Sequence, residues 1–144
     1  MEALITGRVS HGVKSAAIAE AAFDAARRYA TEREAFGRSL SKFQAIRFKL
    51  ADMATRIEAA KSLAYKAAWL YSTGRPCVKE ASMAKFFSAE VADYVCREAV
   101  QIHGGYGYIV ESPVERYYRD AKLASITEGT SEIQQLIIGK ELGL

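Results

Sequence analysis

Two glycine-containing segments in the last third of the chain carry the residue types and spacing that could do chemistry. The first, Gln101–Tyr108, reads Gln-Ile-His-Gly-Gly-Tyr-Gly-Tyr, and the second, Thr127–Glu132, holds the acid Glu128 directly before a glycine. The three glycines of the first segment would let backbone amides approach a ligand closely, because no Cβ stands in the way. A phosphate or pyrophosphate suits such a loop, and a helix-ending turn with packed tyrosines is the alternative.

Glu128 and Arg33 are the charged residues with the clearest possible roles. A carboxylate in an apolar loop shielded by bound ligand has a raised pKa, which suits Glu128 to proton abstraction as a general base. A solvated loop acid is the alternative. Arg33 could clamp an anion, or it could simply favour the negative end of a helix. His11 and His103 have no partner at ligand spacing, so we assign them no chemistry and predict no metal site.

Composition favours one globular domain over residues 1–144, because half of the 144 residues are hydrophobic. The net charge of +3 is scattered along the chain. It suits small anionic ligands but gives no support to nucleic-acid binding. Cys77 and Cys96 have no metal-type spacing, so we expect buried reduced thiols in a reducing compartment.

No apolar run reaches the length needed to span a membrane, and the first residues lack the pattern of a signal peptide. We therefore expect a soluble cytoplasmic protein, or one of the mitochondrial matrix if the source is eukaryotic.

Two long helices are expected before the helix that leads into Gln101–Tyr108. The first runs from Gly7 to about Arg33, with apolar and small residues recurring at helical spacing. Those residues are Val9, Val13, Ala17, Ala21, Ala25 and Tyr29. A loop with Gly37 follows, and Ser41-Lys42-Phe43-Gln44 has the form of a capping box that opens the second helix. Its apolar stripe alternates steps of three and four up to Gly74, and consists of Phe43, Ile46, Leu50, Met53, Ile57, Ala60, Ala64, Ala67 and Tyr71.

Three further helices are expected to place the two candidate segments. One runs from about Pro76 to Ile102, and another opens at Ser112-Pro113 with a capping box and continues to about Ala124. Thr130 or Ser131 can cap a short last helix that carries Ile133, Leu136 and Ile137. No strand-like alternation is present. The predicted fold is all-α: an up-and-down four-helix bundle with a short additional C-terminal helix.

The motifs taken together resemble those of the C-terminal helical domain of the acyl-CoA dehydrogenase family. They occur in the family's order and cover essentially the whole chain. The matching segments are Arg33-Glu-Ala-Phe-Gly, Phe43-Gln44, Ala51-Asp52-Met53, Met83-Ala84-Lys85, Gln101 to Tyr108, Pro113-Val-Glu-Arg, Tyr118-Arg-Asp-Ala-Lys-Leu and Glu128-Gly-Thr-Ser-Glu-Ile-Gln.

This resemblance implies the α,β-dehydrogenation of an acyl-CoA thioester with FAD as cofactor. Glu128 would take the α proton while the β hydrogen leaves as hydride to the flavin, and the backbone amide of Glu128 would polarise the thioester carbonyl. Gly129 would lie against the substrate, and Arg8 matches a substrate-side position. Some relatives carry the base on the first helix just before an arginine. Here that place is Gly7, which favours Glu128.

The resemblance also implies a flavin site shared between subunits, and hence a homo-oligomer such as a dimer or tetramer. The residues that would bind the FAD of a neighbouring subunit are Arg33, Phe36, Gln44 and the Gln101-to-Gly105 loop, including Gly104 and Gly105. Thr130 and Glu132 would touch the flavin of their own subunit. Thr127 replaces the aromatic residue that many relatives have beside the base, which leaves the acyl-chain preference open.

The family's helical N-terminal domain and middle β domain have no counterpart in these 144 residues. The chain is therefore expected to work with those domains or with a partner that supplies them, and to pass electrons to an electron-transfer flavoprotein or a similar acceptor. The alternatives are one piece of a split enzyme and a non-catalytic helical module for oligomerisation. In each case, surfaces that face missing partners should be unusually apolar.

Overall fold

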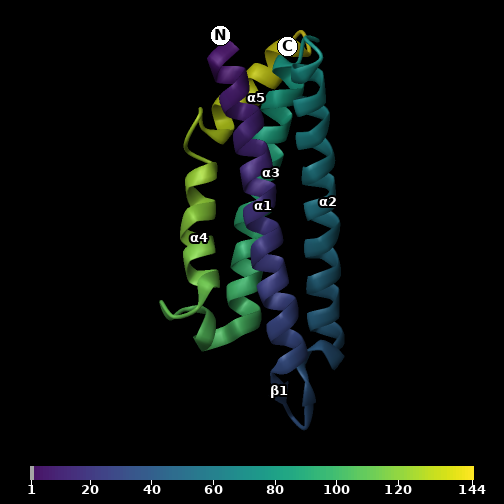
Figure 1. Ribbon diagram of the computed structural model, residues 1–144, viewed down its shortest axis with the longest axis vertical. Helices are drawn as coiled ribbons and strands as arrows, with labels where there is room; N and C mark the ends of the chain where they lie inside the picture. The colour runs from purple at the N-terminus through teal and green to yellow at the C-terminus, as the bar shows by residue number, and fades with distance from the viewer. Residues whose placement is uncertain (1) are drawn as a thin grey trace.

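Four helices run alternately up and down the long axis of the molecule in the computed structural model, which describes residues 2–144 (Figure 1). In chain order the elements are α1 (Glu2–Glu32), β1 (Glu34–Ala35), β2 (Arg38–Ser39), the 3-10 turn η1 (Leu40–Lys42), α2 (Gln44–Ser72), α3 (Val78–His103), the 3-10 turn η2 (Gly104–Gly107), α4 (Pro113–Ala124) and α5 (Ser131–Glu141).

Helix α3 is the centre of the bundle, since α1, α2, α4 and α5 all pack against it. Helix α4 also packs against α1, and α5 caps the end at which α1 begins (Figure 1). The β1–β2 hairpin lies at the opposite end. This arrangement confirms the predicted all-α, up-and-down bundle with a short additional C-terminal helix.

The core of the bundle is built largely of alanine, so the long helices approach one another closely. The buried residues of α1 are mostly small, and they include Ala16, Ala19, Ala22, Ala26 and Ala30. Of the stripe predicted for this helix only Val9 is buried, whereas Val13 is 38% exposed. Steps of four residues turn about 40° beyond a full helical turn each time, so that stripe winds off the buried face.

The stripe predicted for α2 is confirmed in its middle, where Met53, Ile57, Ala60, Ala64 and Ala67 are buried. Its alternating steps of three and four keep these residues on one face of the helix. At its C-terminal end the prediction is wrong, because Leu70 is buried and Tyr71 is exposed.

The capping box predicted at Ser41 does not form. Ser41 lies in η1, and its hydroxyl shares a 2.8 Å hydrogen bond with the hydroxyl of Ser39. Helix α2 instead begins at Gln44 after Phe43, with no side-chain cap. Because Ser41 lies within the 3-10 turn, two residues before the N-cap position Phe43, its hydroxyl is not placed to accept from the first free amides of α2. The other serine cap also makes no side-chain hydrogen bond, although Pro113 does occupy the first turn of α4.

A short antiparallel hairpin, which the sequence pattern did not predict, joins α1 to α2. Glu34 pairs with Ser39 and Ala35 with Arg38 across the turn residues Phe36 and Gly37. Both turn residues have positive φ, 52° and 78°. This is the type I′ geometry that matches the twist of two-residue hairpins. Strands of two residues are too short to show alternation in a sequence.

Two further features concern the cysteines and the membrane. Cys77 and Cys96 are both buried and unpaired, as expected. Burial raises the pKa of the Cys96 thiol to about 12. No helix in residues 2–144 is long and apolar enough to cross a membrane.

Candidate functional site

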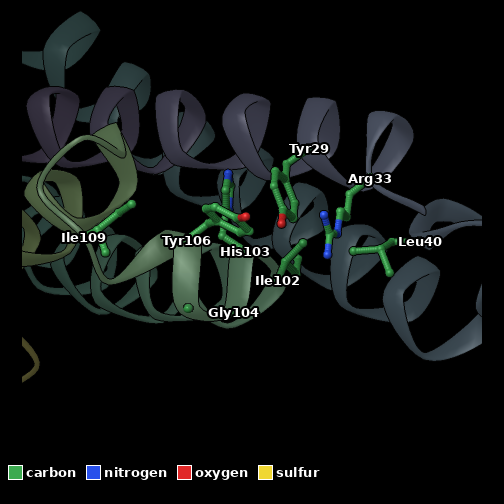
Figure 2. A pocket seen from close by; sticks show the side chains of 9 residues that line it. Tyr29, Arg33, Leu40, Ile102, His103, Gly104, Tyr106 and Ile109 are labelled. Atoms are coloured by element: carbon green, nitrogen blue, oxygen red, sulfur yellow. The ribbon is translucent and has the colours of Figure 1, made fainter. Parts of the chain in front are cut away.

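A pocket of about 540 Å³ opens beside the end of α3, and we call it the glycine pocket (Figure 2). Its lining comes from α1, the turn before α2, the end of α3 and the loop that follows. The lining residues are Tyr29, Arg33, Leu40, Ile102, His103, Gly104, Gly105, Tyr106 and Ile109. The structure thus brings together Arg33, Gly104 and Gly105, three of the residues singled out in the sequence.

The three glycines of this loop have different structural roles. Gly104 has φ of 60° and ψ of −138°, a conformation that side chains disfavour, and it ends α3. A Cβ built on Gly104 or Gly105 would meet no atom within 4 Å, so both backbones are open to a ligand. Gly107 is buried, and a Cβ there would lie 2.7 Å from the carbonyl oxygen of Val100. The third glycine therefore closes the loop against α3.

Aromatic contacts fix the walls of the glycine pocket. The rings of Tyr29 and His103 stack with centroids 4.3 Å apart, and Nδ1 of His103 donates to the carbonyl of Ala99 at 2.8 Å. The guanidinium carbon of Arg33 lies 5.8 Å from the centre of the Tyr106 ring. Figure 2 shows the side chains of Tyr29, in α1, and Arg33, just after α1, on the side of the pocket that faces the end of α3. The guanidinium of Arg33, an exposed residue, therefore lies beside the Tyr106 wall of the pocket.

Phe36, Gln44 and Gln101 do not line the glycine pocket. Phe36 projects from the hairpin tip with 96% of its surface exposed. Its ring meets that of Phe43 edge to face at 6.4 Å. Gln44 and Gln101 are exposed residues in the first turn of α2 and the last turn of α3. An exposed phenylalanine with a left-handed backbone is unusual, and such strain concentrates at sites of function.

Glu128 lies in a second cluster, the turn Thr127–Thr130 between α4 and α5, which we call the Glu128 turn. Glu128 has φ of 55° and Gly129 has φ of 88°, so two successive residues adopt the left-handed conformation. The carboxylate of Glu128 lies against the backbone of Gly7 in α1: a Cβ at Gly7 would be 2.9 Å from Cδ of Glu128. The fold therefore brings together two positions that are 121 residues apart in the sequence.

Two buried side chains support the Glu128 turn from behind. Nζ of Lys85 donates to the carbonyl of Gly129 at 2.6 Å. Nε2 of Gln134 lies 3.0 Å from the carbonyl oxygens of both Glu128 and Gly129. Sequence reasoning assigned neither residue a role. A signal was present, since Lys85 falls among Ala81, Ala84 and Ser88 on the buried face of α3, where a lysine needs an explanation.

Arg8, Thr130 and Glu132 lie around the same end of the bundle. Arg8 is 9% exposed, and its Nε has no hydrogen-bond partner within the described part of the chain. Thr130 and Glu132 line a hollow of about 510 Å³ beside α3 and α4. The pKa of Glu132 lies below its ordinary value because its carboxylate accepts hydrogen bonds from its own backbone amide and from Thr130.

The glycine pocket and the Glu128 turn occupy different ends of the bundle. Lys85 touches the turn, and His103, eighteen positions later in α3, lines the pocket. At 1.5 Å per residue this is a separation of about 27 Å along the helix. A small ligand seated at one cluster therefore does not reach the other cluster of the same chain.

Comparison with known proteins places the chain in a family. The family description "Acyl-CoA dehydrogenase, C-terminal domain" matches residues 1–143. An acyl-CoA dehydrogenase of Bacillus subtilis is 53% identical over 142 residues, which are 99% of this chain and 38% of that protein. The caffeyl-CoA reductase–Etf complex subunit CarC of Acetobacterium woodii is 51% identical over 138 residues, or 96% of this chain and 36% of that protein.

The fold comparison agrees. The structure of butyryl-CoA dehydrogenase from Megasphaera elsdenii superposes with a TM-score of 0.97 at 48% identity, covering 98% of this chain and 37% of that one. The chain thus spans little more than a third of the length of these relatives. The family match over residues 1–143, together with these relatives, identifies the chain as a member of the acyl-CoA dehydrogenase family, corresponding to the family's C-terminal domain.

Proposed function

We propose that this chain supplies the catalytic base and part of the flavin site for α,β-dehydrogenation of an acyl-CoA thioester. The observation that carries the proposal is the contact of the Glu128 carboxylate with Gly7. The two places where the family carries its base, one on the first helix and one before α5, meet here at one point. Of the two residues at these places, Gly7 and Glu128, only Glu128 has a carboxylate.

Glu128 has the surroundings that proton abstraction needs. Its carboxylate is the free end of an exposed residue, so it can reach a substrate that approaches this end of the bundle. Among the hydrogen bonds of residues 2–144, none takes the backbone N–H of Glu128. That amide is free to donate to the thioester carbonyl, and this donation makes the α proton more acidic. Gly129, which has no side chain, lies beside the same space.

FAD is the cofactor on which the family depends, and the glycine pocket fits a flavin dinucleotide. The pocket combines the cation of Arg33 with two backbone positions, Gly104 and Gly105, that no Cβ covers. A cationic side chain beside glycine backbone that a ligand can approach closely suits a pyrophosphate group. The N–H of Gly104 itself already donates to the carbonyls of Val100 and Gln101. When bound, FAD would accept the β hydrogen as hydride. We assign Phe36, Gln44 and Gln101 to the rim of this site, and Thr130 and Glu132 to contacts with a flavin at the other end of the chain.

The 27 Å between the two clusters, about the length of eighteen helical residues, favours a shared site. We infer that the glycine pocket of one copy and the Glu128 turn of another hold the same FAD in a homo-oligomer. The remaining walls, including those for the acyl-CoA, would come from the N-terminal and β domains. Arg8 would face the substrate. An electron-transfer flavoprotein would take the electrons, since one relative is a subunit of a reductase–Etf complex.

The test of the base is reconstitution. The chain is combined with separately produced N-terminal and β domains of a relative, and flavin absorbance and acyl-CoA dehydrogenation are measured. The Glu128→Gln variant should keep the flavin and lose dehydrogenation. Glu141→Gln, which changes an exposed acid near the end of α5, is the matched control and should keep both. An unchanged rate in Glu128→Gln would refute the assignment.

The test of the flavin site compares Arg33, which directly follows α1, with Arg28 inside α1. Arg33→Met should release flavin from the assembled protein, because it removes the cation of the glycine pocket while keeping side-chain length. Arg28→Met removes an exposed charge within α1 and should retain flavin. Equal flavin content in the two variants would argue against the glycine pocket as the pyrophosphate site.

A non-catalytic oligomerisation module is the second candidate, and one observation favours it. Helix α2 exposes Phe48, Tyr65 and Trp69 at 64%, 58% and 54%. Exposed aromatic residues of this size are typical of contact surfaces. Under this alternative the chain forms stable dimers or tetramers without flavin, and reconstitution yields no dehydrogenation. A monomer by light scattering at all concentrations would count against it.

A further inference from the structure

Lys85 is a buried ammonium group that the chemistry described above does not use. It lies in α3 with 1% of its surface exposed, and it has the largest volume of any fully buried side chain in the described part of the molecule. None of the ion pairs formed within residues 2–144 includes it. Its hydrogen bond goes to the carbonyl of Gly129 at 2.6 Å.

An ammonium buried without a paired carboxylate is strongly unfavourable. Burial, and then the charge of Arg8, lower the pKa of Lys85, whereas the charges of Glu132 and Glu128 raise it by less. A methionine would fill a similar volume on this helix face without desolvating a charge. The reason for a lysine at this buried position must therefore lie in the group to which it donates a hydrogen bond.

What Lys85 binds is a backbone that needs support. A glutamate in the left-handed region is disfavoured by its Cβ, and a following glycine adds no stiffness of its own. The carbonyl of Gly129 accepts hydrogen bonds from two buried side chains, Lys85 and Gln134. The carbonyl of Glu128 also accepts a hydrogen bond from Gln134. Those two carbonyl directions fix ψ of Glu128 and ψ of Gly129. The two donor residues, Lys85 and Gln134, belong to the packed helices α3 and α5.

We propose that Lys85 is a positioning residue that, together with Gln134, holds the Glu128 turn in its left-handed conformation. This keeps the carboxylate of Glu128 in its place over Gly7. The catalytic consequence rests on the proposed function, because it requires Glu128 to be the base. The hydrogen bonds and the conformation of the turn do not depend on it.

The first experiment uses the unaltered 144-residue chain, so it does not depend on any variant folding. In a sample labelled with 15N and 13C, a scalar coupling through the hydrogen bond should connect Nζ of Lys85 to the carbonyl carbon of Gly129. Detection of the coupling supports the proposal. Its absence, when the Lys85 ammonium signal itself is observed, would overturn it.

The second experiment removes the donor. Lys85→Met should shift the carbonyl signal of Gly129 and the amide signals of Glu128 and Thr130. Lys79→Met is the matched control, since Lys79 lies in the first turn of the same helix and its ammonium pairs with Glu80 at 3.8 Å. It should leave those signals in place. Unshifted signals in a folded Lys85→Met chain would contradict the proposal, and if this variant fails to fold, Gln134→Met takes its place with the same readout.

The third experiment measures the consequence for the base after the missing domains have been supplied. Lys85→Met should lower kcat on the order of 100-fold, the loss expected for a carboxylate misplaced by about 1 Å, with little change in KM. The kinetic isotope effect for an acyl-CoA deuterated at the α carbon should rise, because proton abstraction becomes slower. A purely structural lysine would leave the isotope effect unchanged, and that result would overturn the positioning role. If Glu128→Gln also retains full activity, the proposed function fails instead, and the coupling experiment still decides the hydrogen bond.

Discussion

Replacing Gly7 by alanine should displace the carboxylate of Glu128 while leaving the fold intact. The new Cβ would lie 2.9 Å from Cδ of Glu128. Nonbonded carbon atoms at their best separation are about 3.5–4.0 Å apart, so the carboxylate must retreat by roughly 0.6–1 Å. Because this group is the free end of a flexible side chain, its retreat costs little energy.

Stability and activity should therefore change in opposite directions. Alanine in a helix interior is favoured over glycine by about 0.5–1 kcal/mol, so the free energy of unfolding should rise. Activity of the assembled enzyme should fall on the order of 100-fold, since a shift of about 1 Å at a reacting group has that effect. Gly139→Ala is the matched control. It lies in α5, where a new Cβ meets no atom within 4 Å, so it should raise stability and keep activity.

The assay pairs urea unfolding of the isolated chain with dehydrogenation after reconstitution. If Gly7→Ala and Gly139→Ala retain equal activity, the position of the Glu128 carboxylate does not matter to the reaction. A loss of stability in Gly7→Ala would show that the contact cannot be relieved by the side chain alone. Either result refutes the reasoning from the Gly7 contact.

Three further predictions concern stability and are measured by urea unfolding. The thiol of Cys96 has its pKa raised to about 12 by burial, so it stays protonated in the folded chain after the unfolded thiol, with its ordinary value of 9.0, ionises. Stability should fall as pH rises above 9, by about 1.4 kcal/mol per pH unit from this group, and Cys96→Ala should show a smaller slope. Phe36→Asn should raise the free energy of unfolding by about 0.5–1 kcal/mol, because asparagine tolerates the left-handed turn and the exposed ring buries little; a large loss would show that Phe36 supports the hairpin. Lys49→Met should cost about 1–2 kcal/mol, since it leaves the largely buried Glu98 without the cation from α2. Lys61→Met should change little, because its partner Glu20 is half exposed. Equal effects of the two lysine variants would argue against the Lys49–Glu98 pair as a link between helices.

The sequence predicted the number, order and approximate ends of the helices, because amphipathic spacing and the glycines and prolines between helices are local signals. It did not predict which face of α1 is buried. That helix is rich in alanine on several sides, so hydrophobic periodicity does not choose among them, and contact with α3 decides. The serine cap at Ser41 failed for a related reason: the motif is local, but the hairpin beside it sets where α2 begins.

The candidate residues could be identified from the sequence, but their grouping could not. Gly7 was recognised only as a position without a base, and nothing local indicates that the carboxylate of Glu128 packs on it. Three neighbouring glycines likewise look equivalent in sequence, yet Gly107 supports the loop while Gly104 and Gly105 are open. Such distinctions depend on which backbone lies opposite each residue, and this is set by tertiary packing.

The separation of the two clusters bears on the short length of this chain, which spans little more than a third of its relatives. One copy carries a pocket suited to a pyrophosphate at one end and a supported carboxylate at the other, about 27 Å away by the helical rise. Under the proposed function neither cluster completes a site within its own copy. Each needs a second copy for the other half of the flavin contact and further domains for the acyl-CoA. Flavin affinity should then depend on the concentration of assembled chains, whereas the conformation of the Glu128 turn, which Lys85 and Gln134 fix within one copy, should not.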